Sequence, residues 1–215
     1  MINALEALVR LRNGNHRFVT GHASTPALSH AAREALVAGQ EPFAIILGCS
    51  DSRVPAELVF DQSFGDLFVI RVAGNVVAPS QIGSVEFAAS RFGTSLVVVM
   101  GHSQCGAVVA TLEELQGRAT NQSRNLRSIV DRVRPSVETL LAGGGRVDPA
   151  TLLREAVRAN VRASVNHLRH GSELLEQLIR ENGLLVVGAE YSLETGMVEF
   201  FENVPLAAQP GLFAS

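Results

Sequence analysis

A short apolar run, residues 45–47, leads into three side chains of different chemistry. Cys49, Asp51 and Arg53 occupy alternate positions, and on extended backbone this spacing points their side chains the same way. A thiolate is a soft metal ligand, and a carboxylate can bind a metal or accept a proton. A guanidinium can hold such a carboxylate ionised through paired hydrogen bonds. The segment therefore has the residue types of a reactive centre.

A second polar segment follows another apolar run, residues 96–100, and reads Gly-His-Ser-Gln-Cys-Gly over residues 101–106. The chain has only two cysteines, and each stands at the end of an apolar run. Zinc binds thiolate and imidazole ligands, and a catalytic zinc site leaves the fourth position open. We therefore predict a catalytic zinc held by Cys49, His102 and Cys105.

Other interpretations of these residues remain open at this point. Asp51 could be a fourth zinc ligand or could accept a hydrogen bond from the metal's reactive group. The two cysteines could be inert and buried, or could form a disulfide, which is rare in the cytosol. A structural zinc would require a fourth cysteine or histidine at suitable spacing, and the chain has none there.

Residues 101–105 also resemble the strand–turn–helix motif G-x-S-x-G of serine hydrolases, with Ser103 as the nucleophile. Cysteine occupies the fifth position, where the motif requires a small glycine. Asp148 and then His167 or His170 follow in the order of that catalytic triad, but both histidines fall in a predicted helix. This hypothesis also leaves the first polar segment unexplained.

Size and composition favour one globular domain. With 215 residues, 47% hydrophobic and 18% charged, the chain can bury a core without disulfides. A net charge of −3 gives no indication of nucleic-acid binding, and no apolar run approaches the ~20 residues that span a membrane. All 18 basic residues are arginine, which excludes lysine Schiff-base chemistry. The N-terminal segment lacks the pattern of a signal peptide, so we expect a cytoplasmic location.

The elements that must position the two polar segments are short apolar strands separated by helices. The strands are continuously apolar, which is typical of a parallel sheet with helices on both faces. Ligands bind such sheets beyond the carboxyl ends of the strands, where both segments lie. We predict an α/β fold with a mainly parallel sheet of four to five strands. Strands are expected at residues 43–47, 67–72, 96–100, 184–189 and 197–201, and helices at 29–38, 84–92, 106–115, 122–142, 149–169 and 172–182.

Residues 1–40 are predicted to form a helical arm that precedes an α/β core at 41–215, the whole being one domain, 1–215. Asn3 and Glu6 have the spacing of a helix capping box. No core partner for the arm is evident, so we expect it to pack on a second subunit. The apolar stripe of its first helix is predicted to comprise Leu5, Leu8, Val9 and Arg12.

The sequence resembles the β-class carbonic anhydrases of bacterial type. The resemblance rests on residues 49–53, 65–75 and 102–106, and extends from about residue 40 to residue 191. It implies zinc-dependent, reversible hydration of carbon dioxide to bicarbonate and a proton by zinc-bound hydroxide. It also implies a homodimer or homotetramer, with the N-terminal helices embracing the partner and the active site at the subunit interface. Hydrolysis of a related molecule such as carbon disulfide remains an alternative.

Matching positions carry the family's roles onto this chain. Asp51 and Arg53 match the catalytic dyad, and in some members the counterpart of Asp51 swings onto the zinc at lower pH. The zinc ligands are Cys49, His102 and Cys105. The substrate-pocket positions are Gln40, which would reach the neighbouring subunit's site, with Phe68, Ala73, Phe87 and Gly106.

The chain departs from the family pattern at two places. Many members have tyrosine at the position of Phe87, so one pocket hydroxyl is missing here. Some members are inhibited by bicarbonate bound to a tryptophan, an arginine and a tyrosine. Arg71 and Tyr191 match two of these residues, but Ile46 stands at the tryptophan position and the chain has no tryptophan. The chain therefore has two of the three residues of this regulatory site.

Overall fold

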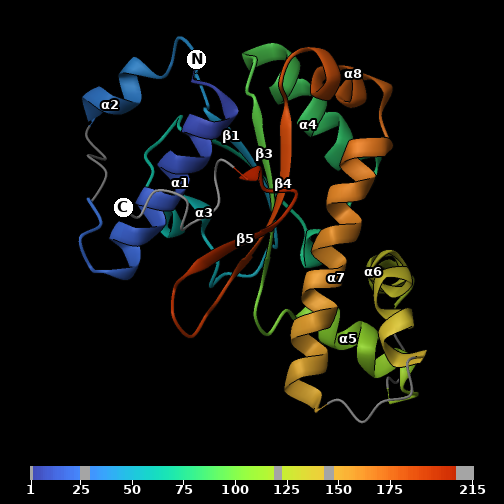
Figure 1. Cartoon of the computed structure of the whole chain (residues 1–215). Coiled ribbons are helices and arrows are strands. Elements are labelled where there is room, and N and C mark those ends of the chain that lie inside the picture. The colour runs from blue at the N-terminus through green and yellow to red at the C-terminus, as the bar shows by residue number, and fades with distance from the viewer. Residues whose placement is uncertain (1, 25–29, 119–122, 143–147, 207–215) are drawn as a thin grey trace.

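The computed structural model describes residues 2–24, 30–118, 123–142 and 148–206. A five-stranded sheet lies at its centre, with strand order β2-β1-β3-β4-β5 (Figure 1). The first four strands are parallel and β5 runs antiparallel to β4. This confirms the predicted α/β fold. The strands are β1 (Ala44–Gly48), β2 (Leu67–Arg71), β3 (Leu96–His102), β4 (Leu185–Tyr191) and β5 (Val198–Glu202).

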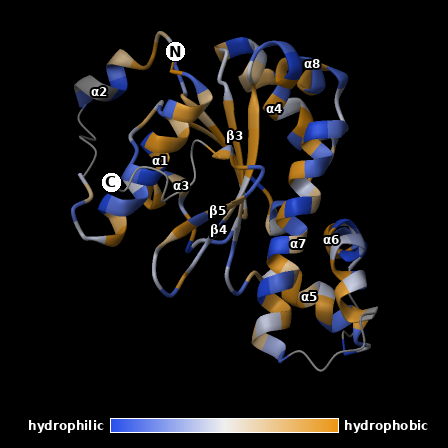
Figure 2. Cartoon of the chain, viewed as in Figure 1, coloured by the Kyte–Doolittle hydropathy of each residue, from blue (hydrophilic) through white to orange (hydrophobic). Residues whose placement is uncertain are grey.

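Helices cover both faces of the sheet. Helices α1 and α3 pack on one face, and α4, α7 and α8 pack on the other (Figure 1). Strands β1 and β3 are buried along their whole length, and the sheet is mostly hydrophobic in Figure 2. The helices are α1 (Ala4–Val19), α2 (His30–Ala35), α3 (Ala56–Val59), α4 (Pro79–Phe92), α5 (Gly106–Leu115), α6 (Arg124–Ala142), α7 (Pro149–His170) and α8 (Glu173–Glu181), with a short 3-10 helix η1 (Ala73–Asn75).

Several predicted boundaries shift, and three lie partly outside the described residues. Helix α4 begins five residues before the predicted 84, because Pro79 suits the first helical position. Strand β3 extends beyond residue 100 to His102, where it still pairs with Tyr191 of β4. Helix α2 ends at Ala35 instead of residue 38. Residue 29 of the predicted helix 29–38, residue 122 of the predicted helix 122–142, and residues 1 and 207–215 of the predicted domain are outside the described part of the chain.

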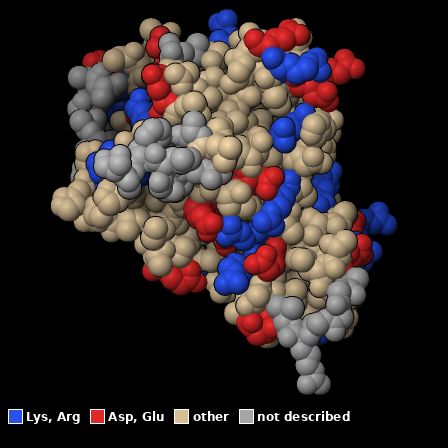
Figure 3. Space-filling model, in the orientation of Figure 1, with Lys and Arg blue, Asp and Glu red and all other residues tan. Residues whose placement is uncertain are grey.

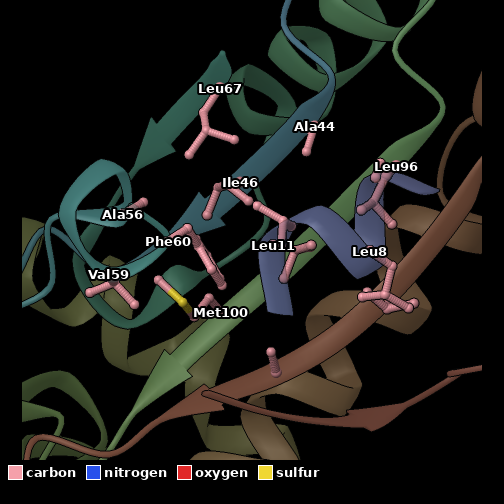
Figure 4. Packing of buried hydrophobic residues seen from close by; sticks show 14 of the residues in the cluster. Leu8, Leu11, Ala44, Ile46, Ala56, Val59, Phe60, Leu67, Leu96 and Met100 are labelled. Carbon is pink, nitrogen blue, oxygen red and sulfur yellow. The ribbon is translucent and has the colours of Figure 1, made fainter. Parts of the chain in front are cut away.

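Helix α1 has a core partner in its own chain, contrary to the expectation for the N-terminal arm. The predicted capping box is present, since Asn3 and Glu6 each accept a backbone N–H of the other. Leu8 and Leu11 are fully buried, and Figure 4 shows both on the side of α1 that faces the sheet. The predicted apolar stripe was wrong in part, because Leu5 and Val9 are 41% and 48% exposed. The buried face of α1 is rotated from that stripe by part of a turn. The buried face comprises Ala4, Ala7, Leu8, Leu11, Gly14 and Asn15.

We expect Leu11→Ala to lower the free energy of unfolding by about 2–5 kcal/mol, because it removes a buried side chain and leaves a cavity. Val9→Ala, on the exposed side of the same helix, should lower it by less than about 0.5 kcal/mol. Urea denaturation of both variants measures the difference. Equal stability of the two variants would show that α1 does not belong to the core of its own chain.

Ion pairs join α7 to the edge strand β5. Arg158 makes two hydrogen bonds of 2.9 Å to Glu199, and Arg162 lies 3.4 Å from Glu202. Arginines and acidic residues lie close together on the face that Figure 3 shows. These exposed pairs contribute little to stability individually, but they align α7 against the sheet. No helix in the described ranges is both long and apolar enough to cross a membrane.

Candidate metal centre

The two polar segments meet where the strand order reverses, because the chain places β2 on one side of β1 and then crosses to place β3 on the other side. Strands β1 and β3 are neighbours, although β2 lies between them in the sequence. Cys49 directly follows β1, His102 ends β3, and Cys105 is the N-cap of α5. The three potential ligand atoms lie within 4.8 Å of one another, and all three residues are buried. The predicted ligand set is therefore brought together at the switch point.

His102 has the hydrogen bonding of a metal ligand. Its side chain is fully buried, and its Nδ1 lies 2.8 Å from the carbonyl oxygen of Ser103, to which Nδ1–H donates. Its Nε2 is buried and has no hydrogen-bond partner among the described residues. Backbone hydrogen bonding at one ring nitrogen fixes the tautomer that leaves the other free to ligate. A metal at this site would satisfy the unpaired nitrogen.

The thiols of Cys49 and Cys105 shift each other's pKa in opposite directions. A hydrogen bond from Cys105 lowers the pKa of Cys49 to about 4, against the opposing effect of burial. The same hydrogen bond raises the pKa of Cys105. Cysteine ligates a metal as the thiolate, so a bound cation would favour the deprotonated form of both residues. Two thiolates and one imidazole form a donor set that suits zinc.

Asp51 and Arg53 are held together by a turn, not by the extended backbone that their spacing predicted. The backbone N–H of Arg53 donates to Asp51 Oδ1 at 3.0 Å, and Val54 N–H donates to the carbonyl oxygen of Asp51 at 3.1 Å. The prediction was wrong because the aspartate side chain pairs locally with the backbone and bends it. The turn brings the guanidinium of Arg53 onto both carboxylate oxygens, at 2.9 and 2.7 Å.

The carboxylate of Asp51 lies beside the candidate ligands. Its Oδ2 is 3.9 Å from His102 Nε2, and the side chain is 18% exposed. The hydrogen bonds from Arg53 hold the pKa of Asp51 well below its usual range. Asp51 is therefore ionised at neutral pH and is engaged with Arg53. It does not belong to the group of three residues that converge within 4.8 Å.

The sequence analysis named Arg71 only as a match to a bicarbonate-binding arginine and included Gly74 only in a family motif, so the role of both in positioning this site was missed. The guanidinium of Arg71 donates to the carbonyl oxygens of Cys49 and Asp51, at 3.0 and 2.5 Å, so it supports the backbone that carries both side chains. The N–H of Gly74 donates to Cys49 Sγ at 3.4 Å. The one signal in the sequence was that residue 74 is a glycine. Its φ of 68° is one that other residues rarely adopt.

Ser103 lacks the surroundings of a hydrolase nucleophile. Its hydroxyl donates to Glu194 at 2.8 Å and accepts the N–H of Leu193 at 2.9 Å. These contacts attach the β3–α5 loop to the β4–β5 turn. His167 and His170 lie in the last turn of α7, near α8, whereas Ser103 follows the carboxyl end of β3 (Figure 1). The two histidines of the proposed triad therefore lie at the far end of α7 from the residues of that helix that share a cavity with Ser103.

The predicted pocket residues form two groups. Ala73 and Gly106 lie beside the candidate metal ligands. Ala73 precedes Gly74, whose N–H donates to Cys49 Sγ, and Gly106 follows Cys105. Phe68 and Phe87 are ring neighbours at 6.2 Å, close to the edge strand β2, and Phe87 is 54% exposed. Exposed Gln40 lines a shallow hollow on the same edge. The single chain thus leaves this second group on its surface.

The residues matched to bicarbonate inhibition lie on separate strands. Ile46 and Tyr191 are buried in one hydrophobic cluster, on the α1 face of the sheet. Arg71, on β2, uses its guanidinium on the backbone near Cys49. With isoleucine in place of tryptophan, no indole N–H is available at this position.

The similarity of the chain to known proteins shows which family it belongs to. The sequence profile described as carbonic anhydrase matches residues 44–198. Carbonic anhydrase 2 of Mycobacterium tuberculosis is 40% identical over 202 residues, covering 94% of this chain and 95% of its own. The chain belongs to the carbonic anhydrase family. The carbonic anhydrase of Mycolicibacterium smegmatis is also 40% identical, over 200 residues, covering 92% of this chain and 93% of its own.

A solved structure agrees with the β class. The β-carbonic anhydrase CafA of Aspergillus fumigatus superposes with a TM-score of 0.73 at 25% identity, covering 94% of this chain and 93% of its own. This carbonic anhydrase therefore catalyses the reversible hydration of carbon dioxide, with zinc as its metal. Both the unpaired nitrogen of His102 and the two thiols fit that metal.

Proposed function

We propose that this carbonic anhydrase binds zinc through Cys49, His102 and Cys105 and uses Asp51 and Arg53 as its catalytic dyad. The observation that carries the proposal is the convergence of the three ligating atoms within 4.8 Å, with His102 Nε2 buried and unpaired. When bound, zinc lowers the pKa of water and so supplies the nucleophile for carbon dioxide.

The dyad orients that nucleophile. Asp51 accepts a hydrogen bond from the attacking water, which directs the lone pair of the oxygen at the carbon of carbon dioxide. Arg53 holds both carboxylate oxygens, at 2.9 and 2.7 Å, and so keeps Asp51 ionised and in one orientation. The 3.9 Å between Asp51 Oδ2 and His102 Nε2 supports this role, because it places the carboxylate next to the ligand atoms. Movement of Asp51 onto the metal in a closed state would require these bonds to break.

The substrate pocket is proposed to be completed by a second copy of the chain. Ala73 and Gly106 would line the pocket beside their own metal. Gln40, Phe68 and Phe87 would line the pocket of the partner, which accounts for the exposure of Phe87 and Gln40. We also propose that the protein forms a homodimer or homotetramer and that it is cytoplasmic. Residues 1–215 are proposed to form a single domain. We also propose Arg71 and Tyr191 as bicarbonate-binding residues, at a site that lacks the tryptophan found in some family members.

We expect the purified protein to hold about one zinc per chain and to hydrate carbon dioxide faster above about pH 8 than at pH 7. The thiolates of Cys49 and Cys105 neutralise the charge of the metal, so the attacking water is less acidified than at tris-histidine sites, where its pKa is ~7. The dyad does not contribute to this pH dependence, because the lowered pKa of Asp51 keeps the carboxylate ionised throughout. Stopped-flow hydration assays with zinc quantification measure both quantities.

Zinc removal provides the control. Chelation should abolish hydration, and added zinc should restore it. A rate that stays flat from about pH 6.5 to about pH 9 would contradict the expected effect of the two thiolates. One zinc per chain without hydration would point to a closed site or to another substrate.

A further inference from the structure

The turn η1 contacts the candidate metal centre from a different part of the chain. It follows β2, and the N–H of Gly74 donates to the buried sulfur of Cys49 at 3.4 Å. Backbone N–H donors to a ligating sulfur stabilise its negative charge and fix its direction. The position of Gly74 therefore bears on how Cys49 is presented to a metal.

This turn has an unusual backbone conformation. Gly74 has a φ of 68° and Asn75 a φ of 44°, so two consecutive residues are left-handed. A Cβ on Gly74 would lie 2.9 Å from the Cβ of Ala107, in the first turn of α5. Within the turn, Asn75 N–H donates to the carbonyl oxygen of Val72 at 3.0 Å. Such strained conformations persist where the surrounding structure holds them.

Two side chains of α7 hold the turn. Asn160 Nδ2 donates to the carbonyl oxygen of Gly74 at 2.7 Å, and Ser164 Oγ donates to that of Asn75 at 3.0 Å. Asn160 is 2% exposed and Ser164 5% exposed, on a helix face that is otherwise apolar. A buried amide is costly unless it is hydrogen bonded, so these contacts define where α7 and the turn meet.

We infer that Asn160 is a positioning residue for the metal site, acting on Cys49 through Gly74. Its amide fixes the Gly74 carbonyl, and this keeps the N–H of the same residue directed at Cys49 Sγ. Ser164 donates to the carbonyl oxygen of Asn75, one residue farther from the contact between Gly74 N–H and Cys49 Sγ. The inference rests on the proposed role of Cys49 as a zinc ligand. It predicts that loss of Asn160 changes the metal site itself, while loss of Ser164 changes chiefly stability.

The test compares Asn160→Ala and Asn160→Ser with Ser164→Ala in the full-length protein. Zinc affinity is measured by competition with a chelator, and the thiolate environment by the sulfur-to-cobalt charge-transfer band of the cobalt-substituted protein. We expect both Asn160 variants to bind zinc about 10-fold more weakly, as is typical when a group that supports a metal ligand is lost. Their charge-transfer band should shift. Ser164→Ala should bind zinc within about threefold of the parent, with the parent's spectrum.

Thermal unfolding of each metal-free variant separates stability from metal binding. The serine variant keeps a polar side chain and provides a second folded protein if the alanine variant is unstable. Parent-like zinc affinity and spectrum in either folded Asn160 variant would overturn the inference. A parent protein that takes up no zinc would instead contradict the ligand assignment, so the two failures are distinguishable.

Discussion

Replacing Cys49 with serine should lower zinc affinity by more than about 100-fold and remove carbon dioxide hydration in proportion. A serine hydroxyl stays protonated at neutral pH and is a poor ligand, so the metal would keep only His102 and Cys105. Loss of an actual ligand should exceed the 10- to 100-fold effects typical of supporting groups. Zinc content after dialysis, chelator competition and stopped-flow hydration measure the result.

Ser50→Ala is the matched control for this substitution. Ser50 is the next residue and is exposed, so its replacement should leave zinc content and hydration unchanged. Far-ultraviolet circular dichroism of the metal-free proteins checks that Cys49→Ser still folds. A folded Cys49→Ser protein that retains zinc at the parent's affinity would overturn the assignment of Cys49.

The sequence predicted that Cys49, His102 and Cys105 come together, because a parallel sheet brings the carboxyl ends of its strands to one edge. Cys49 and His102 lie at such ends, and their polar segments interrupt apolar runs that are easily recognised. The boundary of α5 at Gly106 and the cap of α7 at Asp148 were equally accessible, because each depends on local residue types. The carbonic anhydrase family followed from the same short motifs.

Residues that act through the backbone were not predictable in this way. Arg71, Gly74 and Asn160 are remote in sequence from Cys49 or Asp51, and their contacts depend on how α7 and η1 dock on the sheet. Helix α1 shows a related limit. Leu5 and Leu8 are equally apolar, and only the tertiary contacts determine that Leu8 is buried and Leu5 exposed.

Replacing Asp51 with asparagine should leave zinc content unchanged and lower turnover by about 100-fold or more, the range expected for loss of a positioned proton-accepting group. The amide has one oxygen and one NH₂ group, so it cannot accept both hydrogen bonds from Arg53. With the NH₂ in the place of Oδ1, it would oppose the Nε–H and the backbone N–H of Arg53. With the NH₂ in the place of Oδ2, it would oppose the Nη2–H of Arg53 and would also present a donor to the attacking water, where the reaction requires an acceptor. Stopped-flow hydration and zinc analysis of the same preparation measure the two effects.

Asp66→Asn is the matched control, because Asp66 also pairs with an arginine. Its Oδ1 lies 2.7 Å from the guanidinium of Arg10, on a different part of the chain, and its loss should leave hydration unchanged. If Asp51 served chiefly as a fourth ligand, Asp51→Asn would lose zinc affinity together with activity. If the carboxylate had no catalytic role, the variant would keep both. Zinc retained at the parent's affinity with turnover lost is the combination that the dyad alone predicts, since Arg53 holds the carboxylate beside the metal site and not within the group of converging ligands.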